Sequence, residues 1–154
     1  MIITKELAGK IATELKEKGK KIVFTNGCFD IIHAGHVEYL GKAKQLGDYL
    51  FLGLNSDASV RRLKGEGRPI NNEDDRATVI DALKPIDYVV LFEEDTPFNL
   101  VKEIVPHILV KGGDYKAEDI VGYDIVTKNG GEVITVSFVD GKSTTNIINK
   151  INIK

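Results

Sequence analysis

The chain of 154 residues contains a single cysteine, Cys28. One thiol excludes an internal disulfide, and it also excludes a structural zinc site built from several thiolates. The 21 Lys and Arg side chains are balanced by 23 Asp and Glu side chains, for a net charge of −2. Proteins that bind a nucleic-acid backbone are usually basic, so this balance argues against a nucleic-acid partner.

Long apolar segments are missing as well. No apolar run approaches the ~20 residues that a membrane-spanning helix needs. Residues 1–6 contain no basic region followed by an apolar stretch, so we expect no signal peptide. From these absences we expect a cytoplasmic protein that has no membrane partner. The length and the 42% hydrophobic content fit one domain over residues 1–154.

Apolar residues recur with two different periods along the chain. Leu7, Ile11 and Leu15 lie four positions apart, which predicts a helix over about 4–18 with Thr4 as its N-cap. Continuous apolar runs rich in β-branched residues predict five buried strands. The predicted strands are 21–26, 49–54, 87–91, 108–110 and 133–136. Helices are expected at 34–45, from 72, from 96, at 117–128 and from 143 to about 151, and a polar loop at 57–72.

Strands that alternate with helices in this way are typical of a parallel sheet covered on both faces. We therefore predict a Rossmann-like, doubly wound α/β fold with five parallel strands in the order 3-2-1-4-5. The core of this single domain would span about 20–151, after the N-terminal helix. Such sheets bind ligands at the carboxyl ends of the strands, where the strand order reverses. The loops after the first and fourth strands are therefore the expected site.

Two histidines follow the first predicted strand. One helical turn places His33 and His36 on the same side, and Gly35 removes a side chain that would block close approach. The N-terminus of a helix adds free N–H groups and positive potential, so this pattern predicts a phosphate site. The imidazoles can donate hydrogen bonds to charge that develops on a phosphoryl oxygen. Ordinary histidines, or a zinc pair without an obvious third ligand, are the alternatives.

The sequence of residues 27–36, Gly-Cys-Phe-Asp-Ile-Ile-His-Ala-Gly-His, resembles the His-x-Gly-His signature of the nucleotidylyltransferase superfamily, in its cytidylyltransferase-like branch. Four later segments resemble the adenylyltransferase domain of bifunctional ADP-heptose synthases. These segments are 63–69, 92–97, 110–115 and 143–148. The resemblance covers about residues 20–151, which is nearly the whole chain.

This resemblance implies transfer of AMP from ATP to a heptose 1-phosphate, giving ADP-heptose and pyrophosphate for lipopolysaccharide core or other surface glycans. A sugar phosphate has a second pKa near 6 and is already largely dianionic at pH 7, so it would attack the α-phosphate without a general base. Mg²⁺ is expected to accompany ATP, and no protein side chain is assigned as a metal ligand. A homodimer and a separate sugar kinase are also expected.

The resemblance assigns roles to three groups of residues. The catalytic group, which would stabilise the reacting phosphates, is His33, His36 and Lys64. The residues expected to bind the nucleotide are Thr25, Gly27, Cys28, Phe29, Gly35, Arg76, Lys111, Gly112, Ser143, Thr144 and Thr145. Asp30 and Asp114 are expected to contact the substrate.

Several side chains keep an alternative role. The basic loop carries four cations, of which any could be the important one: Arg61, Arg62, Lys64 and Arg68. Arg76 would either touch phosphate or pair with Asp74 or Asp75. Asp30 would orient a neighbour, interact with metal or cap a loop. His107, before the fourth strand, is expected to be structural.

Two other functions compete with this one. A CTP-dependent enzyme acting on a polyol phosphate such as glycerol 3-phosphate would use the same chemistry. Those relatives carry an arginine shortly before the Ser-Thr pair, whereas this chain has Val139 and Asp140 there, which weakens that alternative. A non-catalytic nucleotide-binding module would keep the pocket, but it has no need of transition-state donors such as His33 and His36.

Overall fold

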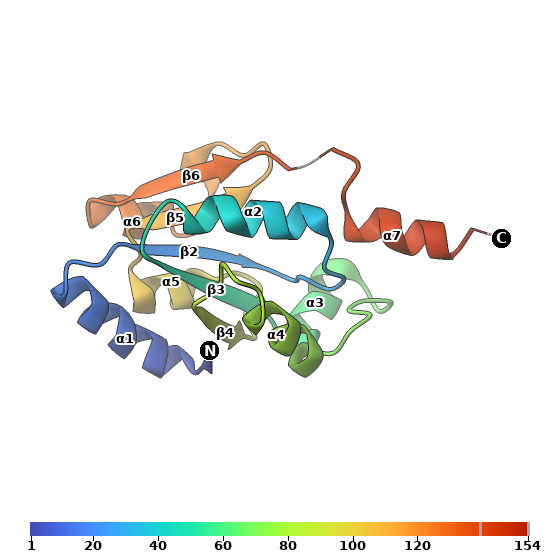
Figure 1. Cartoon of the computed structure of the whole chain (residues 1–154), viewed down its shortest axis with the longest axis horizontal. Coiled ribbons are helices and arrows are strands. Elements are labelled where there is room, and N and C mark those ends of the chain that lie inside the picture. Colours follow the sequence, from blue (N-terminus) through green and yellow to red (C-terminus); the bar gives the residue numbers. More distant parts are fainter. Residues whose placement is uncertain (139, 154) are drawn as a thin grey trace.

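Six parallel strands form one open sheet in the computed structural model, which describes residues 1–138 and 140–153 (Figure 1). The strand order is β1-β4-β3-β2-β5-β6. The strands are β1 (Ile2–Ile3), β2 (Ile22–Gly27), β3 (Tyr49–Asn55), β4 (Tyr88–Phe92), β5 (Ile108–Gly112) and β6 (Glu132–Val136). Val139, one of the two positions considered for the missing arginine, lies outside the described residues, as does Lys154.

The predicted fold class and strand order are confirmed. The five predicted strands correspond to β2 to β6 and lie in the order 3-2-1-4-5. The strand count is one short, because the short strand β1 pairs with β4 at the edge of the sheet through Ile2 and Ile3. Two residues are too few to give a periodic signal in the sequence.

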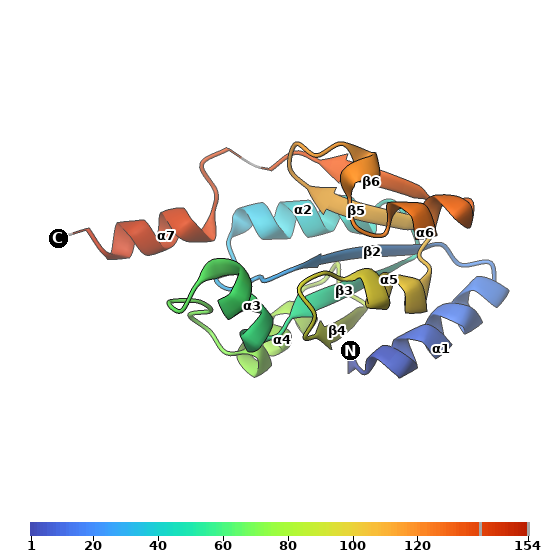
Figure 2. The ribbon, with the colours of Figure 1, turned by 180° about the vertical axis from the view of Figure 1, so that it is seen from behind.

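Helices cover both faces of the sheet, as Figures 1 and 2 show from opposite sides. The helices are α1 (Lys5–Glu17), α2 (Ala34–Lys44), α3 (Asp57–Lys64), α4 (Glu73–Asp81), α5 (Phe98–Ile104), α6 (Tyr123–Lys128) and α7 (Thr144–Ile151), with a 3-10 turn at Ala117–Asp119. One half of the core joins α1, α5 and α6 to the sheet, and the other half joins α2 and α4. Adjacent residues of β2, such as Val23 and Phe24, belong to opposite halves, as expected for a strand buried on both faces.

Two local predictions are wrong. The segment expected as a polar loop over 57–72 begins with the helix α3, whose N-cap Ser56 accepts a hydrogen bond from the Ser59 N–H. The helix expected over 117–128 is divided into the 3-10 turn and α6, because Gly122 has a φ of +95° between them. None of the helices within residues 1–138 and 140–153 has the length and apolarity needed to cross a membrane.

Candidate active site

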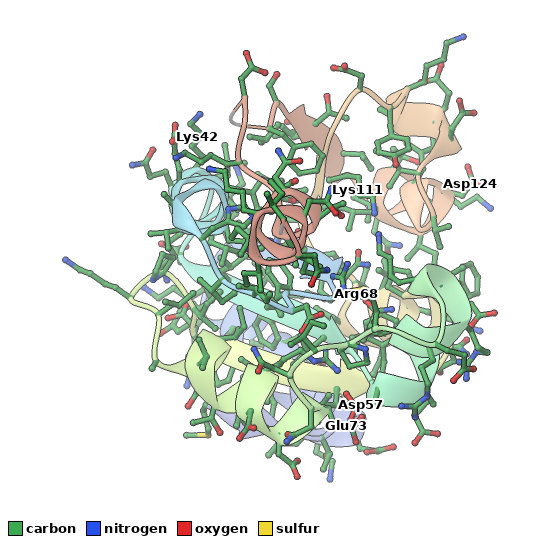
Figure 3. All side chains as sticks on the ribbon, turned by 90° about the vertical axis from the view of Figure 1, so that its right-hand side faces the viewer. Lys42, Asp57, Arg68, Glu73, Lys111 and Asp124 are labelled. Atoms are coloured by element: carbon green, nitrogen blue, oxygen red, sulfur yellow. The ribbon has the colours of Figure 1, made fainter. Side chains whose placement is uncertain are left out.

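A cleft of about 790 Å³ lies at the carboxyl ends of β2, β3 and β5, between the first turns of α2 and α7 and the last turn of α3. β2 and β5 are neighbours at the point where the strand order reverses, which is where a ligand is expected. Figure 3 shows this end of the molecule, with Arg68 and Lys111 near the centre of the view. Most of the predicted site residues line the cleft: Gly27, Cys28, Phe29, Asp30, His33, Gly35, His36, Lys64, Lys111, Gly112, Ser143, Thr144 and Thr145.

The two histidines are stacked on each other at the start of α2. Their ring centroids are 3.9 Å apart with 24° between the ring planes. The His33 backbone N–H donates to Nδ1 of His36 over 3.3 Å. A neutral imidazole carries one proton, so this contact places the His36 proton on Nε2. His36 can therefore act as a hydrogen-bond donor while it is uncharged.

The environment of the pair favours the uncharged form. Burial, and secondarily the neighbouring His33, lowers the pKa of His36 to about 4. Burial and the nearby Lys142 ammonium also lower the pKa of His33. At pH 7, well above this pKa, the His36 ring is therefore predominantly uncharged. Among the described residues, the buried Nδ1 of His33 has no hydrogen-bond partner, which is unusual for a buried polar atom and typical of a functional site.

Gly35 is required for this stacking. A Cβ atom at this position would lie 2.9 Å from Cε1 and Nδ1 of the His33 ring and 3.0 Å from Cβ of Lys142. Either the ring or the chain before α7 would have to move to accept any other residue. The expectation that a glycine clears space beside the histidines therefore has a steric basis in the structure.

Asp30 binds the segment before α4 to the loop after β2. Its buried carboxylate accepts hydrogen bonds from the Ile70 N–H (2.8 Å), the Asn71 N–H (2.9 Å) and Nε of Arg68 (2.8 Å). Burial alone would raise the pKa of this carboxyl, but the two backbone hydrogen bonds and Arg68 together hold its pKa below the usual value. The structure thus places Asp30 as a residue that orients its neighbours, although it also borders the cleft.

Arg76 is buried below the cleft and does not line it. Its Nε donates to the carbonyl of Asn71, Nη1 donates to the carbonyls of Cys28 and Asn55, and Nη2 pairs with Asp57 at 2.7 Å. The alternative that Arg76 pairs with Asp74 or Asp75 of its own helix is not what the structure shows, since its carboxylate partner, Asp57, belongs to α3. With its donors directed to the protein, Arg76 is placed to hold the cleft floor rather than to bind nucleotide.

Thr25 and Asp114 also lie away from the cleft wall. The Thr25 hydroxyl is buried, 2.7 Å from the Tyr39 hydroxyl and 3.0 Å from the Val110 carbonyl, so it joins β2 to β5. Asp114 borders a second cavity of about 650 Å³ next to the cleft. His107 is structural as predicted, because its Nδ1 accepts the Ile22 N–H over 2.9 Å.

Three lysines contribute positive charge to the cleft: Lys64, Lys111 and Lys142. Within the described part of the chain, none of the three is in a salt bridge, whereas Arg62 pairs with Asp95 and Arg68 pairs with Asp30. Of the four loop cations, Lys64 is therefore the one that borders the cleft and has no carboxylate partner in the part of the chain that the structure describes. Burial lowers the pKa of Lys111, with opposing smaller effects of Cys28 and Lys64.

The hydroxyls at the start of α7 are partly used by the protein itself. Oγ of Ser143 caps the helix by accepting the Asn146 N–H, and Oγ1 of Thr144 donates to the Ile31 carbonyl. The first N–H groups of this eight-residue helix still border the cleft and offer an anion a favourable site.

Some residues of the cleft wall were missed by the sequence analysis, chiefly Tyr115, Phe138 and Lys142. The position of Lys142, directly before the helix cap Ser143, was an available signal. The aromatic residues gave none, because their position depends on the loops that follow β5 and β6.

Comparison with known proteins identifies the family. The sequence profile of the cytidylyltransferase-like family matches residues 24–150. The chain belongs to the cytidylyltransferase-like family. Its chemistry is therefore that of a nucleotidyltransferase.

Individual proteins of known name are also similar to this chain. The bifunctional protein HldE of Aliarcobacter butzleri is 59% identical over 150 residues, which are 97% of this chain and 31% of that protein. HldE of Pelobacter propionicus is 65% identical over 136 residues, which are 88% of this chain and 28% of that protein. The chain thus spans about 30% of the length of these curated relatives. The crystal structure of the lipopolysaccharide core biosynthesis protein from Thermoplasma volcanium superposes with a TM-score of 0.65 at 32% identity, over 80% of this chain and all of that one.

Two further observations limit the chemistry of this cytidylyltransferase-like site. Among residues 1–138 and 140–153, no three His, Cys, Asp or Glu side chains gather as they would in a metal site built from protein side chains alone. Burial raises the pKa of the Cys28 thiol despite nearby cations, so the thiolate form needed for a nucleophile is disfavoured.

Proposed function

We propose that this chain transfers AMP from ATP to a heptose 1-phosphate, releasing pyrophosphate and ADP-heptose. The observation that carries the proposal is the stacked, uncharged histidine pair, set at a helix N-terminus in a cleft with three lysines that have no carboxylate partner among the described residues. The high identity to HldE proteins over nearly the whole chain supports the choice of a sugar phosphate as the acceptor.

In this proposal the protein positions two anions and stabilises charge. The sugar phosphate is largely a dianion at pH 7, so it attacks the α-phosphorus in line and needs no general base. The N–H at Nε2 of His36 donates to an oxygen whose charge grows during the transfer. Because His36 is already uncharged, it carries out this role without first losing a proton.

The three lysines neutralise the negative charge of the phosphates from different sides of the cleft. Lys64 reaches the cleft from the last turn of α3, Lys111 from β5, and Lys142 from the residue before the α7 cap. In this proposal Lys64 stabilises the charge of the leaving pyrophosphate. Backbone groups of the loop after β2 contact the nucleotide. Asp30 acts indirectly, because it holds Arg68 and the 70–71 backbone beside the cleft.

In this proposal Mg²⁺ enters with the nucleotide, because this cation is usually held mainly by substrate phosphates and water rather than by an all-protein cage. Neutralising the triphosphate is then its contribution. A chelator in excess should abolish pyrophosphate release. We also retain as proposals a cytoplasmic homodimer, one domain over residues 1–154, a role in lipopolysaccharide core synthesis and a separate kinase that supplies the sugar phosphate.

Pyrophosphate release tests the function directly. The purified chain is incubated with Mg²⁺ and either ATP or CTP, together with either heptose 1-phosphate or glycerol 3-phosphate. The proposal predicts release only from ATP with the heptose phosphate. Release from CTP with glycerol 3-phosphate would instead establish a polyol-phosphate cytidylyltransferase. Nucleotide binding without release in any pair would indicate a binding module.

A further inference from the structure

Two exposed aromatic side chains form the wall between the main cleft and the second cavity. Tyr115 and Phe138 border both spaces. Tyr115 is 56% exposed and Phe138 is 66% exposed. Single exposed apolar residues are ordinary on protein surfaces, but two rings at the junction of two cavities suggest a binding surface.

The backbone at the end of β5 holds both rings from one side. A Cβ atom on Gly112 would lie 2.5 Å from Cε1 of Phe138, so the phenyl ring rests directly on the glycine. A Cβ atom on Gly113 would lie 3.1 Å from Cε2 of Tyr115 and 3.3 Å from Cε2 of Phe138. The edges of both rings therefore converge on the same glycine. The Lys111 ammonium lies 5.8 Å from the centroid of the Tyr115 ring, and more than half of each aromatic residue stays exposed.

The two spaces that the rings border differ in the charge of the residues that line them. The main cleft holds the histidine pair, three lysines and Arg68, together with three carboxylates. Two of these carboxylates, Asp30 and Asp95, are paired with arginines, so the three lysines leave the cleft with an excess of positive charge that attracts phosphate. The second cavity is lined by Asp114, Asp140 and Ser137, and its carboxylates repel phosphate. A nucleotide whose triphosphate lies against the histidine pair and the start of α7 would have its neutral base at or near the rings.

We propose that Phe138 and Tyr115 are the base-stacking residues of this site and that they favour a purine over a pyrimidine. The proposal rests on the proposed function, because it takes ATP as the nucleotide. Stacking on an open ring increases with the overlapping area, and a purine has two fused rings where a pyrimidine has one. A phenyl side chain has no polar group with which to read the base edges, so area and shape provide the selection.

Binding of nucleotides without an acceptor tests this proposal. Titration calorimetry compares ATP, CTP and inorganic tripolyphosphate on the wild type, Phe138→Ala and Tyr115→Ala. Phe98→Ala is the matched control, because Phe98 is also an exposed phenyl group (46%) but borders neither cavity. Phe138→Trp tests whether another flat ring restores binding. Thermal unfolding of each variant establishes that the fold is intact.

We expect Phe138→Ala to weaken ATP binding about tenfold or more, the size of one base–aromatic stack. Its affinity for tripolyphosphate should change by less than about twofold, and its preference for ATP over CTP should fall. Tyr115→Ala should act in the same direction, Phe98→Ala should bind like the wild type, and Phe138→Trp should recover ATP binding.

Three results would overturn the base-stacking proposal: unchanged ATP affinity in Phe138→Ala, an equal loss for tripolyphosphate, or an equal loss for CTP. The proposed transfer to heptose 1-phosphate is tested separately from base stacking. A wild type that binds ATP through the rings but releases no pyrophosphate with heptose 1-phosphate would refute the proposed function and leave the base site standing. Normal release together with unchanged ATP affinity in Phe138→Ala would do the reverse.

Discussion

Removal of the Arg76 guanidinium should destabilise the protein rather than directly weaken nucleotide binding. The residue is 1% exposed, and its four hydrogen bonds to protein atoms are 2.7 to 3.0 Å long. In Arg76→Ala, three backbone carbonyls lose a donor and the Asp57 carboxylate loses its cation. Because these partners lie in the loop after β2, at the end of β3, in α3 and before α4, the substitution loosens four segments at once.

The size of the effect follows from burial. Removing one member of a buried ion pair costs about 3–5 kcal/mol. Asp57 is 25% exposed, so water can solvate part of its charge, and we expect the lower half of that range, about 3–4 kcal/mol. For a chain of this length each kcal/mol lowers Tm by about 2–4 °C, which gives a fall of about 6–16 °C.

Urea and thermal unfolding of three variants measure this effect. Arg76→Lys keeps the charge but loses the planar set of donors, so it should lie between the wild type and Arg76→Ala. Arg61→Ala removes an exposed arginine of α3 and should change stability by less than about 0.5 kcal/mol. A loss in Arg76→Ala as small as that in Arg61→Ala would refute the reasoning. A large loss of ATP affinity with unchanged stability would instead place Arg76 on the nucleotide.

Three further predictions concern the histidine pair. His36→Ala should lower kcat for pyrophosphate release at least about 10²-fold. His36→Gln should recover part of this rate, because its side-chain amide can place an N–H near the position of Nε2. Equal kcat values in both variants would exclude the donor role. Gly35→Ala should lower kcat at least about tenfold by displacing the His33 ring. Gly41→Ala is the control and should retain the wild-type rate, because no described atom lies within 4 Å of the added Cβ. Similar kcat values in these two variants would exclude the steric role. By NMR, the His36 ring should titrate near pH 4, and a midpoint near 6.5 would contradict its burial. Because this pKa is lowered on folding, the unfolded chain binds a proton first, so the contribution of His36 to stability falls as the pH drops from about 6.5 to about 4.

The fold was predictable where its signals are local and repeated. Buried strands such as β3 consist of unbroken apolar residues, and helices such as α1 carry a cap and a regular apolar stripe. Helix α3 was missed because it buries only Ser59 and Val60, and its other positions are dominated by charge. Such a helix is stabilised by its N-cap and by the packing of its neighbours, which the periodicity of its own residues does not reveal.

The site was predictable for a similar reason. His33, Gly35 and His36 lie within one helical turn, so their spacing alone brings them together. The role of Arg76 depends on partners up to 48 positions away, at Cys28, and on an acid in the unpredicted helix α3. No local pattern contains that information. The same is true of Phe138, whose proximity to Gly112 requires that β5 and β6 be paired.

The arrangement of charges explains how one cleft can be both stable and reactive. The buried carboxylate of Asp30 accepts hydrogen bonds from backbone N–H groups, and the buried guanidinium of Arg76 donates to backbone carbonyls. These bonds offset the free-energy cost of burying both charges within the fold. The groups that face the cleft are different: the histidines are uncharged, and the lysines have no carboxylate partner within the described residues. These groups would gain their charged partners only when a phosphate enters. Substitutions below the cleft should therefore lower stability first, whereas substitutions on its wall should lower the rate and leave stability nearly unchanged.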